Sequence, residues 1–140
     1  MSEMTYLLHP IGRVVSTLRE TDGAPKQGSD GGPAAWLEFD DEVAAGLREL
    51  GPGDEVVVLT WLHLAHRDVL SVHPRGDRAV PERGVFSTRS PHRPNPIGLH
   101  RVTITATRPG RLRVEPLEAI DGTPVLDVKP ARTSVDHADD

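Results

Sequence analysis

Residues 55–64 read Glu-Val-Val-Val-Leu-Thr-Trp-Leu-His-Leu, a nearly continuous apolar run that is rich in β-branched side chains. β-Branched and aromatic residues favour strands, and a run without polar alternation is typical of a strand that is buried on both faces. The run therefore predicts a buried strand, and the rest of the chain can be placed around it.

The segments that flank this run also favour strands. Residues 102–107 alternate between apolar side chains and threonines, which predicts a half-buried strand, and Arg108-Pro109-Gly110 predicts the turn of a hairpin. Further strands are expected at residues 6–18 (interrupted near Pro10 and Gly12), 35–39, 111–117 and 124–128. No regular alternation of strands and helices occurs, so the predicted fold class is mainly β: a small, mostly antiparallel barrel or sandwich.

A single helix is expected, from Asp40 to Leu50. An aspartate at residue 40 or 41 can cap its start, and Val43, Leu47 and Leu50 form one apolar stripe at helical spacing. Gly51-Pro52-Gly53 then ends the helix. The glycine- and proline-rich residues 21–34 predict a loop, and the residues from 131 to 140 predict a flexible acidic tail.

Composition narrows the class of protein. A chain of 140 residues is long enough for one domain with a core, and the absence of cysteine excludes disulfides, thiolate catalysis and cysteine-bound zinc. No apolar run approaches the roughly 18 residues that span a bilayer, and the first residues lack the pattern of a secretory signal, so no membrane association and a cytoplasmic location are expected.

The charge of the chain is unevenly distributed. The net charge is −5, yet residues 75–108 hold seven arginines and only two acidic residues. A locally basic patch on an acidic protein fits a restricted contact with phosphate or another anion, and it fits ordinary solvated arginines equally well.

The stretch from Gly84 to Gly98, Gly-Val-Phe-Ser-Thr-Arg-Ser-Pro-His-Arg-Pro-Asn-Pro-Ile-Gly, is unusual in composition. Its three prolines fix φ, remove donors and push the preceding residues toward extended geometry, so we expect no helix here. A stiff loop loses little entropy when it binds a ligand, which favours a preorganised binding site. The alternative is a proline-rich connection between strands.

Several polar residues are candidates for chemistry. His63, His66 and His73 cluster after the apolar run, where a metal site is one interpretation and ordinary hydrogen bonding is the other. Residues 121–124, Asp-Gly-Thr-Pro, predict a tight turn that either caps a strand or holds a polar ligand. No glycine-rich phosphate loop and no Gly-x-Ser-x-Gly motif occurs.

Taken together, these motifs resemble the TrmO family, also called TsaA-like or YaeB-like. The likeness runs from His9 to Pro130 and is strongest in residues 84–98 and in Asp121-Gly-Thr-Pro-Val-Leu-Asp-Val-Lys-Pro130. Members of the family are S-adenosylmethionine-dependent tRNA methyltransferases built on a small antiparallel β-barrel. The resemblance implies such a barrel domain over residues 1–130, a homodimer, and methylation of N6-threonylcarbamoyladenosine beside the anticodon in tRNA.

The resemblance also implies a cofactor pocket drawn from dispersed loops. Lysine replaces the family's arginine at residue 26, and leucine replaces its glutamine at residue 64. Transferred position by position, the expected S-adenosylmethionine-binding residues are Pro25, Lys26, Gln27, His63, Leu64, Arg89, Leu99, Asp121, Gly122, Thr123 and Pro124.

The catalytic group stays open at this stage. His63 and His92 are candidate bases by residue type alone, and contact with RNA phosphates would fall to Arg75, Arg78, Arg83, Arg93 and Arg101. The alternatives are a methyltransferase of a small metabolite, a non-catalytic module that binds S-adenosylmethionine, and a histidine–metal hydrolase.

Overall fold

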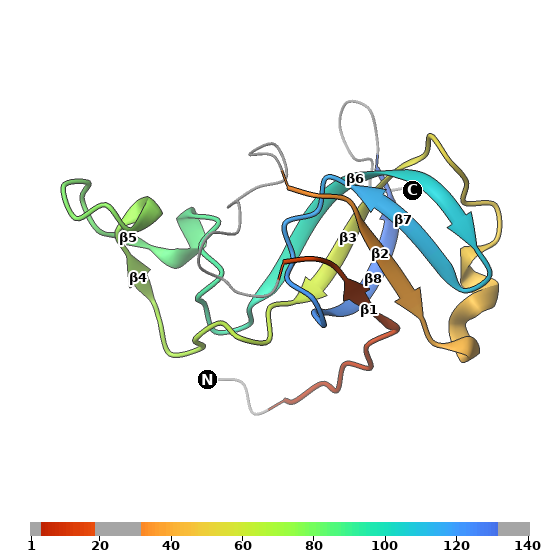
Figure 1. Cartoon of the computed structure of the whole chain (residues 1–140). Helices are drawn as coiled ribbons and strands as arrows, with labels where there is room; N and C mark the ends of the chain where they lie inside the picture. Colours follow the sequence, from red (N-terminus) through yellow and green to blue (C-terminus); the bar gives the residue numbers. More distant parts are fainter. Residues whose placement is uncertain (1–3, 19–31, 132–140) are drawn as a thin grey trace.

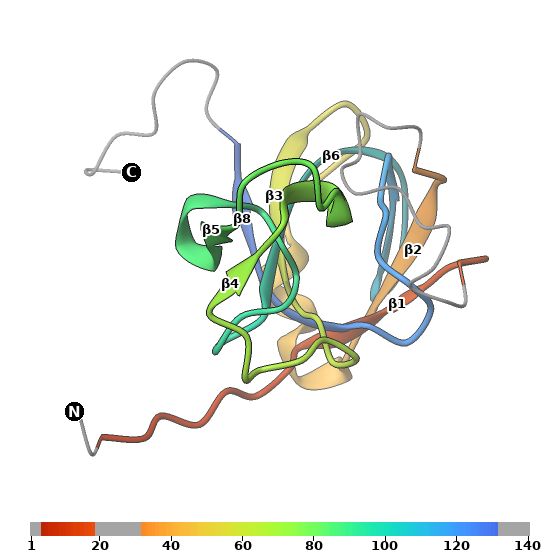
Figure 2. The same cartoon turned by 90° about the vertical axis from the view of Figure 1, so that its left-hand side faces the viewer.

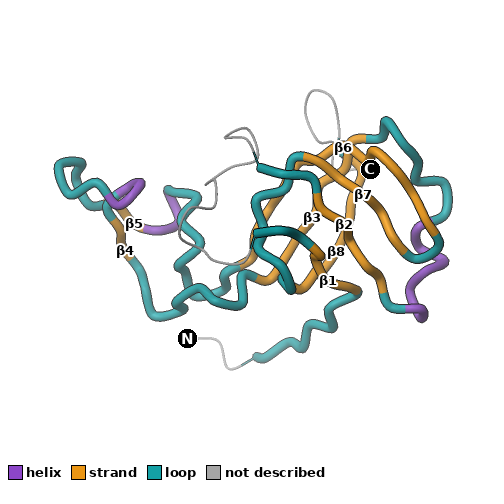
Figure 3. The backbone as a smooth tube through the Cα atoms, in the orientation of Figure 1, coloured by secondary structure: helices purple, strands orange, loops and turns teal. Residues whose placement is uncertain are grey.

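The computed structural model describes residues 4–18 and 32–131. Its elements are β1 (Gly12–Val15), β2 (Ala35–Phe39), the 3₁₀ helix η2 (Asp41–Leu47), β3 (Glu55–Trp61), β4 (Ser71–Val72), η3 (Pro74–Gly76), β5 (Arg83–Gly84), η4 (Val85–Ser87), β6 (Ile97–Arg108), β7 (Arg111–Glu115) and β8 (Pro124–Pro130). Figure 1 shows these elements along the chain, and Figure 3 shows that strands and loops dominate. The predicted mainly β class is confirmed.

Six strands close into an antiparallel barrel in the order β1-β2-β7-β6-β3-β8. Each is antiparallel to both neighbours, so β1, β3 and β7 run toward one end of the barrel, and β2, β6 and β8 start from that end. We call this end the barrel mouth. The residue pattern alone was compatible with a barrel or a sandwich, and the structure shows that the fold is a closed barrel.

The core fills the inside of the barrel with small aliphatic side chains. Val56, Val58, Val102 and Ile104 are among the buried residues, and they alternate along β3 and β6 with residues that face outward. The prediction that β3 is buried on both faces was wrong: Val57, Leu59 and Trp61 are only partly buried on the outer side. A closed antiparallel barrel needs one apolar face per strand, and its outer face meets solvent.

The first strand is shorter than the expected residues 6–18. It begins at Gly12, and residues 4–10 form no strand and are exposed. Pro10 lacks the N–H group that a ladder requires. A side chain at Gly12 would place its Cβ 2.2 Å from the carbonyl oxygen of Glu38, so β1 and β2 pack closely only because this residue is glycine.

The single helix of more than one turn in the described part of the chain is η2, so the expected short helix at 40–50 is confirmed; it spans residues 41–47 and is a 3₁₀ helix. Asp40 makes no side-chain capping bond, and Gly46 lowers helix propensity within a short segment. Val43, Leu47 and Leu50 still pack against the core, as the apolar stripe predicted.

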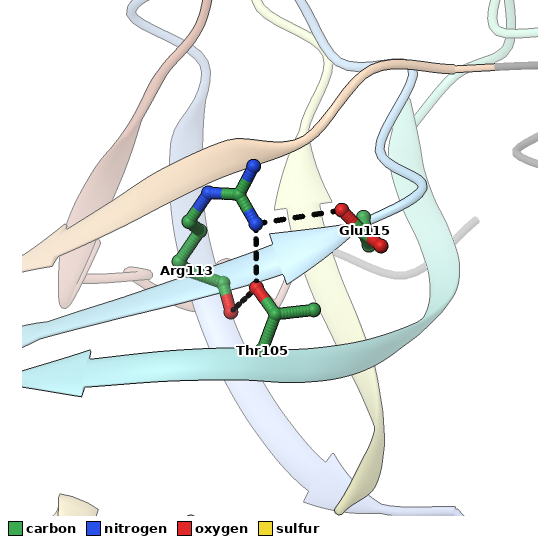
Figure 4. Close-up of polar contacts among 3 residues, drawn as sticks. All are labelled: Thr105, Arg113 and Glu115. Atoms are coloured by element: carbon green, nitrogen blue, oxygen red, sulfur yellow. Dashed lines mark hydrogen bonds and ion pairs between the residues drawn. The ribbon is translucent and has the colours of Figure 1, made fainter. Parts of the chain in front are cut away.

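The hairpin of β6 and β7 is confirmed, with Gly110 at a φ of 70° in its turn. β6 is longer than predicted, because it already begins within the proline-rich stretch at Ile97. On the outer face, Arg113 donates to Thr105 Oγ1 at 2.8 Å and lies 3.4 Å from Glu115 (Figure 4). These contacts bridge the strands where the ladder shifts register between Ile104 and Ala106.

Residues 62–96, between β3 and β6, leave the barrel and form an arm that carries the small β4–β5 sheet. Figures 1 and 2 show this arm standing to one side of the barrel. The expectation of no helix in residues 84–98 was wrong for one turn, since Val85–Ser87 form η4 ahead of the first proline. None of the described helices is long and apolar enough to cross a membrane.

Candidate functional site

Most of the expected site residues lie around the barrel mouth. His63 and Leu64 follow the end of β3, and residues 121–124 lead into β8. Thr60, near the end of β3, pairs with Val125, near the start of β8, so the two segments are neighbours across the ladder. Closure of the barrel thus brings together residues about sixty positions apart, as expected for a ligand site made of loops.

Hydrogen bonds hold the turn of residues 121–124 in one shape. Asp121 Oδ1 accepts the N–H of Ser16 at 3.0 Å, and the N–H of Asp121 donates to Leu18 at 2.6 Å. Thr123 is 1% exposed, and its hydroxyl donates to Ile120 at 2.7 Å. The side chains of Asp121 and Thr123 therefore stabilise the shape of the turn. The exposed residue of the turn is Gly122, whose φ is 85°.

The apolar candidates lie on the outside of the barrel. Leu64 is 55% exposed and Leu99 is 51% exposed, and Leu99 pairs with Leu59 on the outer face of β6 and β3. His63 is exposed as well. A ligand that touched these residues would lie against the outer wall at the mouth rather than inside the barrel.

Arg89 lies on the arm and is exposed. Within the part of the chain that the structure describes, its guanidinium makes no hydrogen bond or ion pair, so it is available to bind an anion. No recorded contact among those residues joins it to the turn at 121–124. The grouping of Arg89 with the turn around one ligand therefore stays a prediction. Pro25, Lys26 and Gln27 lie outside the described residues.

Arg93 organises the segment around Arg89. Its guanidinium donates to the carbonyl groups of Val85 at 2.9 Å, Thr88 at 2.6 Å and Ser90 at 2.8 Å. This partly buried cation therefore shapes the turn that presents Arg89. Arg93 Nε and Nη2 are therefore engaged in the fold, and contact of Arg93 with phosphate stays a prediction.

We expect Arg93→Lys to lower the free energy of unfolding by about 2 kcal/mol, because a lysine ammonium cannot bridge three carbonyl groups with a planar fork. Urea denaturation measures the loss. Arg83→Lys on the same arm is the matched control, since Arg83 is exposed, and its change should stay within about 0.5 kcal/mol. Equal midpoints for the two variants would contradict the role of Arg93.

The other arginines divide by environment. Arg75, Arg78 and Arg83 are exposed on the arm and have no partner among the described residues. Arg101 lies on the outer face of β6, 3.6 Å from Glu55. The arm thus offers a set of free cations, whereas Arg101 is part of the charge pattern of the barrel wall.

The histidines of the arm have separate partners. His66 donates its N–H to His92 Nδ1 at 2.9 Å, and His73 Nδ1 lies 2.9 Å from the carbonyl oxygen of Val80. Within residues 4–18 and 32–131, no three histidine, aspartate or glutamate side chains are placed to share a metal ion. The geometry of these residues supports hydrogen bonding, the second of the two interpretations.

A buried chain of polar side chains, which was not predicted from the sequence, lies just inside the mouth. Thr60 Oγ1 lies 2.7 Å from His100 Nε2, and His100 Nδ1 lies 2.6 Å from Glu118 Oε1. Thr60 and His100 are buried, and the Glu118 side chain is 14% exposed. Alternation along β6 places His100 on the same face as Val102, which is a signal for His100; no local pattern indicates Glu118.

A shallow groove of about 490 Å³ lies on the outside of the barrel beside the turn. Gly122 and Pro124 line it together with the start of β1 and the end of β2. His63, Leu64, Arg89 and Leu99 are not part of its lining.

Comparison with known proteins identifies the family. Residues 13–137 match the model of the tRNA-methyltransferase O N-terminal domain. The chain is 42% identical to an S-adenosyl-L-methionine-binding protein of Archaeoglobus fulgidus over 93% of this chain and 92% of that one. It is also 42% identical to a probable S-adenosyl-L-methionine-binding protein of Methanothermobacter thermautotrophicus, over 97% of each.

Comparison with solved structures points to the same family. The fold matches a crystal structure of TrmO from Pseudomonas aeruginosa with a TM-score of 0.76 and 31% identity, covering 99% of this chain and 60% of that one. The chain thus spans about 60% of the length of that TrmO. The family model covers nearly all of the barrel, and it describes the N-terminal domain of tRNA-methyltransferase O. The chain therefore belongs to the TrmO family.

Proposed function

We propose that this protein binds S-adenosylmethionine and transfers its methyl group to N6 of N6-threonylcarbamoyladenosine beside the anticodon of tRNA. The observation that carries the proposal is the match of residues 13–137 to the tRNA-methyltransferase O domain. The position of His63, Leu64 and residues 121–124 at the barrel mouth supports it. Support for the cofactor comes from relatives at 42% identity that are named for binding it.

The proposed cofactor site combines the arm and the mouth. Arg89 would bind the carboxylate of the methionine moiety, because a free guanidinium offers two parallel donors to a carboxylate. The rigid turn at Asp121–Pro124 and the strand end at His63 and Leu64 would contact the rest of the cofactor. Leu99 would contribute apolar surface from the outer wall.

A homodimer is part of the proposal. The arm extends away from the barrel (Figure 1), and Arg89 on it has no partner among the described residues. The exposed apolar side chains of Leu64, Ile97 and Leu99 offer a surface for a second copy. In such a dimer the cofactor would be held between the arm of one copy and the mouth of the other.

When it is bound, the cofactor supplies the electrophilic methyl group. The contribution of the protein is to align the nitrogen, the methyl carbon and the sulfur, and to restrict water around the reacting centre. The anticodon loop is single-stranded, so its bases can be presented to a pocket. The free arginines of the arm would bind its phosphates.

A radiolabelled methyl assay tests the function. The protein is incubated with labelled S-adenosylmethionine and with tRNA that carries or lacks the threonylcarbamoyl group. Label in the modified tRNA alone supports the proposal. Label in neither, despite binding of the cofactor, refutes it and supports a non-catalytic binding module, which the names of the archaeal relatives favour as the second candidate. Transfer of label to a small metabolite would likewise refute the tRNA as acceptor.

Charge reversal on the arm should weaken tRNA binding selectively. We expect Arg75→Glu with Arg78→Glu to lower tRNA affinity at least about tenfold near physiological salt, because two phosphate contacts are replaced by repulsion. Cofactor affinity should stay unchanged. Filter binding over a salt series measures the effect, and Arg108→Glu on the far end of the barrel is the control. If the double variant kept full tRNA affinity at low salt, a role of the arm in tRNA binding would be contradicted.

A further inference from the structure

The hydrogen-bonded chain of Thr60, His100 and Glu118 belongs to none of the functions assigned so far. It consists of polar side chains in a barrel whose core is mostly apolar. It joins three segments of the mouth: the end of β3, the start of β6, and the residues that precede the turn at Asp121. Burial of polar groups in such a place is costly unless every group is paired, so this chain calls for an explanation.

Two partners hold the His100 ring in place. A carboxylate can only accept hydrogen bonds, so the N–H at His100 Nδ1 donates to Glu118 Oε1. At the other end of the ring, Nε2 lies 2.7 Å from Thr60 Oγ1, a hydroxyl that can donate or accept. A bond at each end of the ring fixes its orientation and, with it, the position of the carboxylate.

Glu118 is the end of the chain that reaches the outside. Its side chain is 14% exposed, one oxygen accepts from His100, and no described residue bonds the second oxygen, Oε2. None of the buried side-chain oxygens in the described residues lacks a partner, which indicates that Oε2 is the accessible part. An oriented carboxylate therefore opens at the mouth, three residues before the Asp121 turn.

We propose that Glu118 is the catalytic base of the methyl transfer, and that His100 and Thr60 are positioning residues that hold it. This inference rests on the proposed function, because it concerns the same site. The N6–H bond breaks and its proton forms an O–H bond on Glu118. The electron pair of N6 forms the bond to the methyl carbon, and the pair of the broken C–S bond remains on sulfur. One sulfonium cation and one carboxylate anion thus become two neutral groups.

The charges in the step favour this assignment. The carboxylate of Glu118 takes up the proton that the substrate nitrogen loses, while the cofactor loses its positive charge. The carboxylate is therefore neutralised in the same step, and no unpaired buried anion remains. Among the described residues, the other titratable groups of the mouth include His100 on β6, His63 after β3, Asp121 in the turn, and Glu115, which ends β7 and pairs with Arg113. His100 already donates to Glu118, and Asp121 already accepts the N–H of Ser16.

The test separates chemistry from binding and from folding. We expect Glu118→Gln, which keeps the shape, to lower kcat for modified tRNA by about 100-fold or more, within the range that general bases contribute. The affinity for S-adenosylmethionine, measured by calorimetry, should change less than about threefold. Glu115→Gln is the matched control, since Glu115 is an exposed carboxylate three residues earlier, and it should retain wild-type kcat.

Chemical rescue adds a measurement that a structural role would not move. Formate should restore part of the activity of Glu118→Ala in proportion to its concentration, because a small carboxylate fills the vacated place. His100→Gln should lower kcat about tenfold without abolishing rescue. A thermal melt of each variant shows whether it folds.

The outcomes are distinct. Loss of kcat in Glu118→Gln with formate rescue of Glu118→Ala supports the base. Wild-type kcat in Glu118→Gln overturns it while the proposed function stands. Equal losses of cofactor affinity and kcat, without rescue, also overturn it, because the carboxylate would then only attract the sulfonium. A wild-type protein that methylates no tRNA would refute the proposed function and this inference with it.

Discussion

Arg89→Ala is expected to lower the affinity for S-adenosylmethionine by about 100-fold or more, which corresponds to about 3 kcal/mol. The guanidinium is exposed and has no partner among the described residues, so its removal leaves the rest of the arm intact. The loss would come from the unpaired carboxylate of the cofactor. Isothermal titration calorimetry measures the dissociation constant directly.

Two controls sharpen this result. Arg78→Ala removes another exposed arginine of the arm and should leave cofactor affinity unchanged. Arg89→Lys keeps the charge but not the planar fork, so it should recover only part of the affinity. Unchanged binding of S-adenosylmethionine by Arg89→Ala would refute the role of Arg89 in the cofactor site.

Gly98→Ala is expected to destabilise the protein by about 3 kcal/mol, because it overpacks the barrel and disturbs a buried hydrogen bond. A Cβ at this position would lie 2.4 Å from Thr60 Oγ1 and 2.7 Å from His100 Nε2. These atoms belong to buried side chains with little room to move. The absence of a side chain at residue 98 therefore makes the bond between Thr60 and His100 possible.

Chemical denaturation measures this loss. Gly51→Ala is the control, because a Cβ at Gly51 would meet no atom within 4 Å, and its change should stay within about 0.5 kcal/mol. In the ¹⁵N spectrum of His100, the signals of Nδ1 and Nε2 should also shift in Gly98→Ala. A variant that unfolds at the wild-type midpoint and keeps these signals would show that the close approach has no energetic weight.

Local patterns were sufficient for much of the fold. Alternation along residues 102–107 identified the half-buried strand, and Arg108-Pro109-Gly110 identified the hairpin turn, because period and turn chemistry act between near neighbours. The motifs at residues 84–98 and 121–130 were long enough to indicate the family. The positions of Lys26 and its neighbours in the expected site stay a prediction.

The wrong prediction for β3 has a physical cause: the burial of a side chain depends on which other elements pack against it. The apolar run of β3 was expected to be covered on both faces, but a closed barrel covers only one. The expected helix, in contrast, is present as the 3₁₀ helix η2, and the three side chains of its apolar stripe pack against the core. The local pattern of apolar residues therefore predicts neither which strand face is exposed to solvent nor how the core is packed.

The amino-acid sequence by itself determined the strands, the turns and the family, since each depends on residues that are close in the chain. Only the tertiary structure decided which polar groups meet. His100 lies 40 residues from Thr60 and 18 from Glu118, and barrel closure alone brings their side chains into hydrogen-bonding distance. Likewise, carbonyl groups of the folded arm bind the Arg93 guanidinium, whereas Arg89 is exposed and has no partner among the described residues.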